Sequence, residues 1–176
     1  MRNPTNPDVP PPALPRVPSH LARRFYQICM GILAEVTPPG LAPLEIGILA
    51  CIDNTPGIDQ RRVADRLAID PVTTGQRIDH LHALGYVARE VDSSDRRVRR
   101  LRLTPEGRKF RCRIRPVMQA AHARTLEALS EEEQETLYNL LERVILAHEA
   151  YARPGNGRRR PGEKQSSTRE KGRQSS

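Results

Sequence analysis

Residues 70–104 have the sequence DPVTTGQRIDHLHALGYVAREVDSSDRRVRRLRLT, and this stretch decides the fold. Asp70 is a favoured helix N-cap, and Pro71 follows it at the first helical position. The helical pattern ends at Gly85, a residue typical of helix C-termini. From Tyr86 the period changes to two, in two short alternating segments separated by a polar turn. The stretch therefore predicts a helix followed at once by a two-stranded hairpin.

The charge of the hairpin and of the segment after it is the next distinguishing feature. Residues 89–115 hold eleven basic and four acidic side chains, a net charge of +7. An α-helix fits the major groove of B-DNA, which is about 12 Å wide, and arginines suit the narrower, more negative minor groove. A helix beside an arginine-rich hairpin therefore predicts a winged helix-turn-helix that binds double-stranded DNA.

Helical periodicity dominates the segments on both sides of this stretch. We expect helices at residues 19–36 with Ser19 as the cap, from Pro43 to about Ile52, at 58–68, from Pro105 to about 129, and from Ser130 to about 148. The predicted fold is mostly α with a small β-hairpin wing, in the order α-α-α-α-β-β-α-α. The first and last two helices are broadly apolar, so we expect a homodimer through these terminal helices.

Composition divides the chain into a domain and two ends that are poor in apolar residues. The first eighteen residues hold seven prolines, and the last twenty-five carry a net charge of +6. Such segments do not bury enough surface to offset their ordering entropy, so we expect both to be disordered. The predicted domains are an arm at 1–18, a folded domain at 19–151 and a basic tail at 152–176, with the winged helix-turn-helix at about 43–104 and dimerisation helices at about 19–36 and 105–151.

Several classes of protein are disfavoured by the same sequence. The cysteines (Cys29, Cys51 and Cys112) are far apart and form no CxxC pattern, which disfavours a disulfide scaffold or zinc site. His80 and His82 are two residues apart, the wrong helical spacing for one metal ion. There is no phosphate-binding glycine loop, HExxH motif or nucleophile elbow. We therefore expect no enzyme activity, no cofactor, no metal and no membrane segment, and a cytoplasmic location.

The segment 56–108, from PGIDQRR to LRLTPEGR, resembles the MarR (multiple antibiotic resistance regulator) family of transcription factors. The most specific piece is Asp95-Arg96-Arg97, followed by Leu103-Thr104 and Pro105-Glu106-Gly107. The resemblance covers about residues 21–148. It implies a homodimer that represses a gene at a palindromic operator, with relief by a small phenolic or aromatic acid or by thiol oxidation.

Candidate DNA contacts come from the start of two helices and from the hairpin. On the helix after Asp70, Thr73 and Gln76 suit base edges and Val72 suits a thymine methyl group. The family often has arginine where Gln76 stands and an apolar residue where Arg77 stands, so the base contact is open between these two. The full candidate set is Gln60, Arg61, Pro71, Val72, Thr73, Gln76, Arg77, His80, Asp95, Arg96, Arg97 and Arg99.

The resemblance gives the hairpin residues separate roles. It implies that Arg97 enters the minor groove while Asp95 orients its guanidinium group, a task for which the planar, permanently charged arginine is suited. Arg96, Arg99 and Arg100 are expected to contact phosphates. An ordinary solvated charge run remains the alternative for these arginines.

Candidate effector contacts are harder to place. An acidic ligand needs a cation or amide beside an apolar cleft, expected here between the DNA-binding module and the dimerisation helices. His20, Arg23, Arg24, Tyr26 and Glu45 are the candidates, with surface or interface roles as the alternative. Three other functions remain open: redox sensing through Cys29, a constitutive architectural DNA-binding protein, and a winged-helix module for protein contacts.

Overall fold

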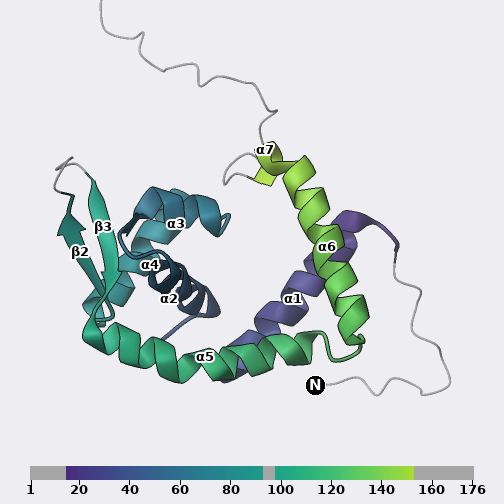
Figure 1. The fold of residues 1–176 in the computed structure, drawn as a ribbon, viewed down its shortest axis with the longest axis horizontal. Helices are drawn as coiled ribbons and strands as arrows, with labels where there is room; N and C mark the ends of the chain where they lie inside the picture. Colours follow the sequence, from purple (N-terminus) through teal and green to yellow (C-terminus); the bar gives the residue numbers. More distant parts are fainter. Residues whose placement is uncertain (1–14, 93–97, 153–176) are drawn as a thin grey trace, which may run out of the picture.

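The computed structural model describes residues 15–92 and 98–152, and its elements form two groups joined by one long helix (Figure 1). In chain order the elements are α1 (Pro18–Val36), α2 (Pro43–Asn54), β1 (Ile58–Asp59), α3 (Gln60–Arg66), α4 (Pro71–Ala83), β2 (Val87–Val91), β3 (Arg99–Leu103), α5 (Pro105–Thr125), α6 (Glu131–Ala147) and α7 (Glu149–Ala152). We call residues 43–103 the core unit, and α1, α6 and α7 the terminal helices. The mostly helical class with a small sheet is confirmed.

The hydrophobic core lies between α2, α4 and the sheet, and α5 closes one side of it. Helical spacing predicts the inward face of α2, and Ile48, Leu49 and Ile52 are fully buried there. The Tyr86 ring stacks on Phe110 of α5 with 4.8 Å between the ring centroids. Other large buried side chains include Ile78 and Leu81 of α4, Val87, Leu101 and Leu103 of the strands, and Ile114 and Met118 of α5.

The sheet has three antiparallel strands in the order β1-β3-β2, one more than the sequence predicted. β3 pairs with β2 over its whole length, from Val87 opposite Leu103 to Val91 opposite Arg99. On its other edge it pairs with β1, where Ile58 lies opposite Leu101. The predicted helix over 58–68 was therefore wrong at its start. Asp59 instead caps α3, its carboxylate accepting a hydrogen bond of 2.9 Å from the backbone N–H of Arg62.

Other element boundaries also differ from the expectations. Val17, and not Ser19, is the N-cap of α1, because the proline at position 18 already occupies the first helical position. α5 ends at Thr125 and is one continuous helix across Pro116. α4 ends at Ala83, and Leu84 is its C-cap residue and is exposed.

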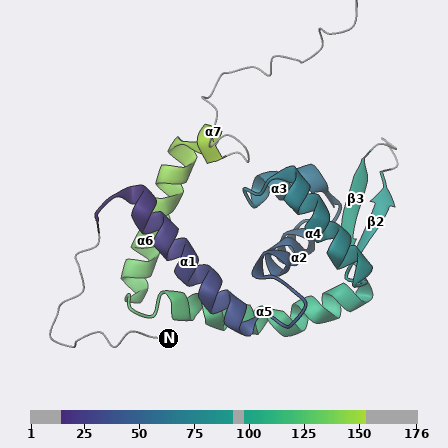
Figure 2. The ribbon, with the colours of Figure 1, turned by 180° about the vertical axis from the view of Figure 1, so that it is seen from behind.

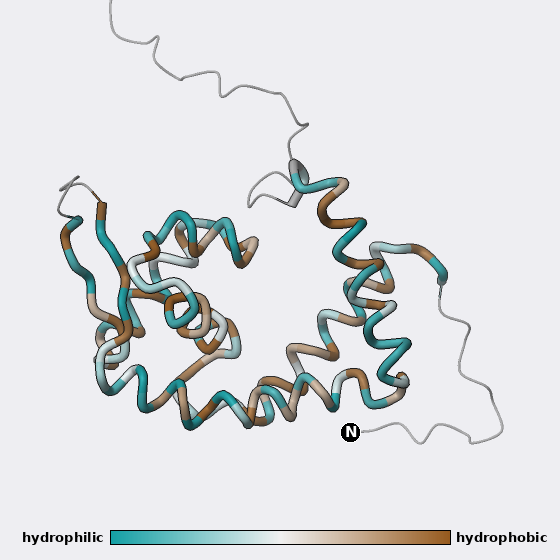
Figure 3. Tube along the Cα trace, viewed as in Figure 1, coloured by the Kyte–Doolittle hydropathy of each residue, from teal (hydrophilic) through white to brown (hydrophobic). Residues whose placement is uncertain are grey.

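The terminal helices differ from the core unit in burial. α1 packs against α5 (Figure 2), yet neither α1 nor α6 contains a buried residue within the described chain. Hydrophobic residues nevertheless occur along both helices (Figure 3). The exposed large ones include Leu21, Phe25 and Ile28 of α1 and Leu140, Leu141, Val144 and Ile145 of α6. A single copy of the chain therefore leaves these apolar side chains exposed.

The chain ends and the hydrophobicity of the helices are the two remaining features predicted from the sequence. The predicted arm up to residue 14 and the predicted tail from residue 153 lie outside the described residues. Among the helices that are described, none has the length and hydrophobicity needed to span a bilayer.

Candidate nucleic-acid interface

α4 is positioned by a side-chain cap and by a buried face. The Asp70 carboxylate accepts a hydrogen bond of 2.8 Å from the backbone N–H of Thr73. Hydrogen bonds from the Thr73 hydroxyl and backbone lower the pKa of Asp70, which keeps the cap ionised. Thr74, Ile78 and Leu81 form the buried face of the helix. The opposite face of α4 is therefore fixed to point away from the core.

The outward face of α4 combines apolar and hydrogen-bonding groups. Val72 is 70% exposed, unusual for a valine, and Gln76 lies one turn further along on the same side. Pro71 is exposed and Thr73 half-buried, as expected for residues flanking this face. The methyl groups of Val72 and the side-chain amide of Gln76 are the groups needed to contact base edges in the major groove.

α3 supports α4 through a close approach of the two helices. The Gln60 side-chain amide donates a hydrogen bond of 3.3 Å to the backbone carbonyl of Pro71. A Cβ atom at Gly75 would lie 2.9 Å from Gln60 Nε2, so glycine permits this approach. Gln60 therefore contacts α4 within the protein, a partner that the sequence did not reveal, while Arg61 is exposed beside it.

Arg77 and His80 of α4 contact a buried carboxylate on α2. His80 Nδ1 lies 2.7 Å from Glu45 Oε1, and Arg77 Nη1 lies 3.7 Å from the same oxygen. Glu45 is 1% exposed. Both side chains were predicted to contact DNA, and the structure places both on the flank of α4 that faces α2. Of the two candidates for the base contact, Gln76 is now favoured over Arg77, because Arg77 already has an acidic partner.

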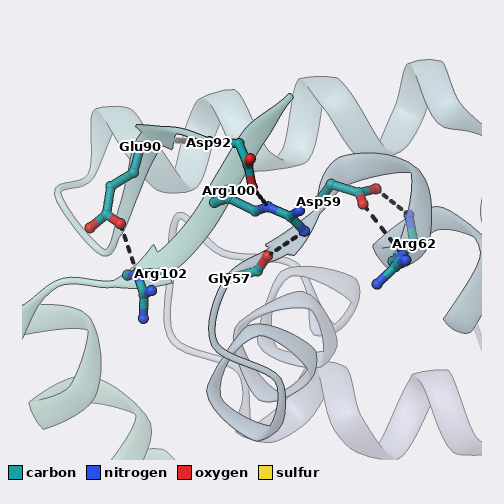
Figure 4. A network of polar contacts seen from close by, with 7 residues as sticks. All are labelled: Gly57, Asp59, Arg62, Glu90, Asp92, Arg100 and Arg102. Carbon is teal, nitrogen blue, oxygen red and sulfur yellow. Dashed lines mark hydrogen bonds and ion pairs between the residues drawn. The ribbon is translucent and has the colours of Figure 1, made fainter. Parts of the chain in front are cut away.

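β2 and β3 carry a network of ion pairs below the tip of the hairpin (Figure 4). Arg100 donates through Nε to Asp92 at 2.5 Å and through Nη1 to the carbonyl of Gly57 at 3.2 Å. The prediction that Arg100 contacts phosphates is therefore disfavoured. Its guanidinium group is already bonded to Asp92 and to Gly57, in the turn before β1. Arg102 pairs with Glu90 at 2.8 Å. Arg99 is exposed at the start of β3.

The hairpin is also tied to α4. Arg89 of β2 pairs with Asp79 of α4 at 2.5 Å, and His82 Nδ1 lies 2.7 Å from the carbonyl of Val87. These contacts fix the strands relative to the outward face of α4. The predicted tip residues Asp95, Arg96 and Arg97 lie outside the described residues.

The five candidate effector residues do not converge on one site. His20, Arg23 and Arg24 line a shallow hollow at the start of α1, together with Pro15 and Leu21. The hollow is formed near the start of α1, not between α1 and the core unit as expected. Tyr26 is exposed on α1.

Glu45 was wrongly grouped with these effector candidates. It is buried on α2, and its other oxygen accepts a hydrogen bond of 2.7 Å from the backbone N–H of Ala42. Its burial was predictable from spacing, because it precedes Ile48 by three residues and Leu49 by four and so shares their inward face.

The cysteine positions weaken the redox alternative. Burial raises the pKa of the Cys29 thiol, which lowers the fraction of reactive thiolate. Burial likewise raises the pKa of Cys51, and Cys112 is exposed on α5. In the ranges that the structure covers, no cluster of three or more His, Cys, Asp or Glu side chains is arranged to hold a metal ion.

Three helices, the last of which packs beside a small antiparallel sheet, define a winged helix-turn-helix protein. Comparison with known proteins extends this assignment. A family model described as MarR family matches residues 40–98. A Thauera aromatica protein provisionally assigned to regulation of the hcr operon is 30% identical over 108 residues, which is 61% of this chain and 65% of that protein. The match therefore spans slightly less than two thirds of that relative.

Two solved structures extend the similarity to nearly their whole length. One is the PcaV transcriptional regulator of Streptomyces coelicolor in complex with its natural ligand, with 28% identity and a TM-score of 0.69. The other is BpsR of Bordetella bronchiseptica, whose DNA binding is regulated by 6-hydroxynicotinic acid, with 26% identity and a TM-score of 0.70. Each match covers 77% of this chain and 97% of the other. Over these lengths the chain is similar to transcriptional regulators of the MarR family.

Proposed function

We propose that this protein is a sequence-specific DNA-binding regulator that represses transcription as a homodimer on a palindromic operator. The observation that carries the proposal is the outward face of α4, where Val72 and Gln76 are exposed beside the arginine-bearing strands. An exposed helix face of this chemistry, fixed by Asp70 and flanked by a cationic hairpin, fits a major groove with the hairpin over the adjacent minor groove.

The residue roles in this proposal follow the geometry. Val72, Thr73 and Gln76 contact base edges, with Pro71 at the edge of the contact. Arg61 and Arg99 contact phosphates, and Gln60 acts mainly by holding α3 against α4. Arg97 in the minor groove, oriented by Asp95 and flanked by Arg96, completes the contact. These three remain predictions from sequence.

The terminal helices support the homodimer. Their exposed apolar side chains are a surface that a second copy of the chain would bury, as in a two-fold symmetric interface. Two copies place two α4 helices on one DNA duplex, which requires an operator with two related half-sites. The palindrome is therefore a consequence of the dimer.

A small aromatic acid is the effector class that we propose. The support is the relative BpsR, for which 6-hydroxynicotinic acid regulates DNA binding, and PcaV, which was solved with its natural ligand. Arg23 and Arg24 offer cationic groups that suit a carboxylate, and the His20 imidazole lies beside them. Tyr26 is retained as a candidate on the same helix, and Glu45 is not.

The DNA-binding proposal is tested by selecting bound sequences from random duplexes and titrating the selected duplex at fixed salt. We expect the selected palindrome to bind about a thousandfold more tightly than random DNA. Arg97→Ala should weaken operator binding by about 1–3 kcal/mol. Lys109→Ala removes an exposed cation on α5 and is the control, expected to leave operator affinity unchanged. Equal affinity for all duplexes would indicate an architectural protein instead.

The effector proposal is tested separately. A thermal-shift screen of benzoic, hydroxybenzoic and hydroxynicotinic acids should find compounds that stabilise the protein and release it from the operator. Arg24→Ala should weaken that release, whereas Arg143→Ala on α6 should not. A response that is identical in the two variants would argue against the α1 site.

A further inference from the structure

Glu45 is an acidic side chain placed inside the core unit. It lies on α2 and is 1% exposed, beside the fully buried Ile48 and Leu49. A buried carboxylate is costly unless it is paired and hydrogen-bonded. Its contacts therefore need a function beyond filling space, because an apolar residue of similar size would pack there without that cost.

Both oxygens of Glu45 have defined partners. Oε2 accepts from the Ala42 backbone N–H at 2.7 Å, which satisfies the first turn of α2. Oε1 lies 2.7 Å from His80 Nδ1 and 3.7 Å from Arg77 Nη1. Arg77 and His80 are three residues apart on α4, so they lie on one flank of that helix. One buried oxygen therefore holds two side chains that border the outward face of α4.

The chemistry of the pair determines how the imidazole is presented. An ionised carboxylate only accepts hydrogen bonds, so Nδ1 of His80 carries a proton and donates it. Nε2 lies across the ring from Nδ1 and so points away from Glu45. The His80 side chain is 42% exposed, so it reaches the surface. Glu45 thereby selects both the ring orientation and the protonated nitrogen.

We propose that Glu45 is a positioning residue for DNA recognition, which sets His80 with Nε2 outward and holds Arg77 to the α2 side of α4. Gln76 then occupies the centre of the outward face. This inference rests on the proposed function, since it concerns the same DNA-binding face. An exposed acidic residue would repel DNA. The buried Glu45 instead contributes to the preference of the protein for particular DNA sequences.

The first experiment compares Glu45→Gln with the wild type in base preference and affinity. Glutamine keeps the size and an oxygen acceptor for Ala42 but removes the charge. We expect the ratio of operator to random-DNA affinity to fall about tenfold, with the loss confined to the base positions beside His80 and Arg77. Glu35→Gln removes the same charge from an exposed site on α1 and should leave the ratio unchanged.

A double-mutant cycle separates positioning from general destabilisation. In a His80→Asn background the further effect of Glu45→Gln on base preference should largely disappear. The same loss in both backgrounds, or a uniform loss at all base positions, would overturn the proposal. If the wild type itself does not discriminate between sequences, the proposed function fails instead, so the two failures are distinguishable.

A measurement on the wild type needs no variant to fold. Nitrogen-15 NMR of the His80 ring in the free protein should show a proton on Nδ1. A neutral ring protonated on Nε2 alone would contradict the assignment, because Nδ1 would then have no proton to donate to the Glu45 carboxylate.

Discussion

The core unit and the terminal helices use similar residues with opposite outcomes. Ile48, Leu49 and Ile52 of α2 are fully buried, whereas Val144 and Ile145 of α6 are more than half exposed in the same chain. The core unit closes over its apolar residues through helices and strands that are near in sequence. α1 packs against α5, but in the described part of the chain neither α1 nor α6 contains a buried residue. The difference teaches that the core unit buries its apolar residues within one copy of the chain, whereas the terminal helices leave theirs exposed, as the proposed homodimer requires.

The largest effect is expected where the core unit meets α5. A Cβ atom at Gly107 would lie 2.1 Å from the backbone oxygen of Tyr86, so Gly107→Ala forces α5 away from the sheet. We expect a loss of about 3 kcal/mol in the free energy of unfolding, measured by denaturant titration.

Gly47→Ala is the matched control for this variant. Gly47 lies inside α2, and a Cβ atom there meets nothing within 4 Å. This variant should gain about 0.5–1 kcal/mol from helix propensity. Equal effects at the two glycines would show that the junction is less tightly packed than the structure indicates.

A charge on the exposed face of α6 should separate the two regions. Val144 is 62% exposed in one chain, and Val144→Asp places a carboxylate in the proposed dimer interface. We expect the variant to sediment as a monomer. Its affinity for the operator should fall on the order of a hundredfold, since one α4 is lost from the complex. Asn139→Asp adds the same charge on the opposite side of α6 and should remain dimeric. A Val144→Asp protein that remains dimeric would contradict the proposal that α6 forms part of the dimer interface.

The hairpin gives a finer test within the core unit. Arg100→Ala removes the contacts to Asp92 and Gly57 and should cost about 1–2 kcal/mol of stability, because these bonds are partly shielded from solvent. Arg102→Ala removes a pair in which both side chains are half exposed, and it should cost less than about 0.5 kcal/mol. Thermal unfolding of the two variants checks the order, and a reversed order would refute the role given to Arg100.

The smallest effect is a dependence of stability on pH at the start of α4. The pKa of Asp70 is lowered in the folded protein, so its contribution is complete above the ordinary Asp pKa of about 3.9 and falls as pH drops through the folded value. Asp70→Asn keeps a capping side chain without the titration. The stability difference between the two proteins should be constant near neutral pH and change only in acid. A carboxyl NMR titration with an ordinary midpoint would contradict the lowered pKa.

Most of the architecture could be predicted because it is local. Asp70 with Pro71, Thr104 with Pro105, and Ser130 with Glu133 mark helix starts that depend on a few adjacent residues, and the structure has helices beginning at each. The strands β2 and β3 follow from alternation and a short turn. By contrast, β1 is two residues long and pairs with a strand about forty residues later, which no local pattern specifies.

The candidate site was less predictable for the same reason. The outward positions of Val72 and Gln76 follow from the helical period of α4. The partners of Arg100, Gln60 and His80 lie on other elements, at Gly57, Pro71 and Glu45, and depend on tertiary packing. The sequence shows which residues are charged, but which of them already have acidic partners within the protein required the three-dimensional structure.

The continuous helix α5 has a mechanical consequence. Its 21 residues extend over about 31 Å, from the sheet to the turn before α6. A rod of this length amplifies small rotations: a tilt of about 10° at one end displaces the other by about 5 Å, more than the rise of about 3.4 Å between successive base pairs. In the proposed dimer on its operator, a ligand that shifted the terminal helices slightly would thus move each α4 out of register with its half-site.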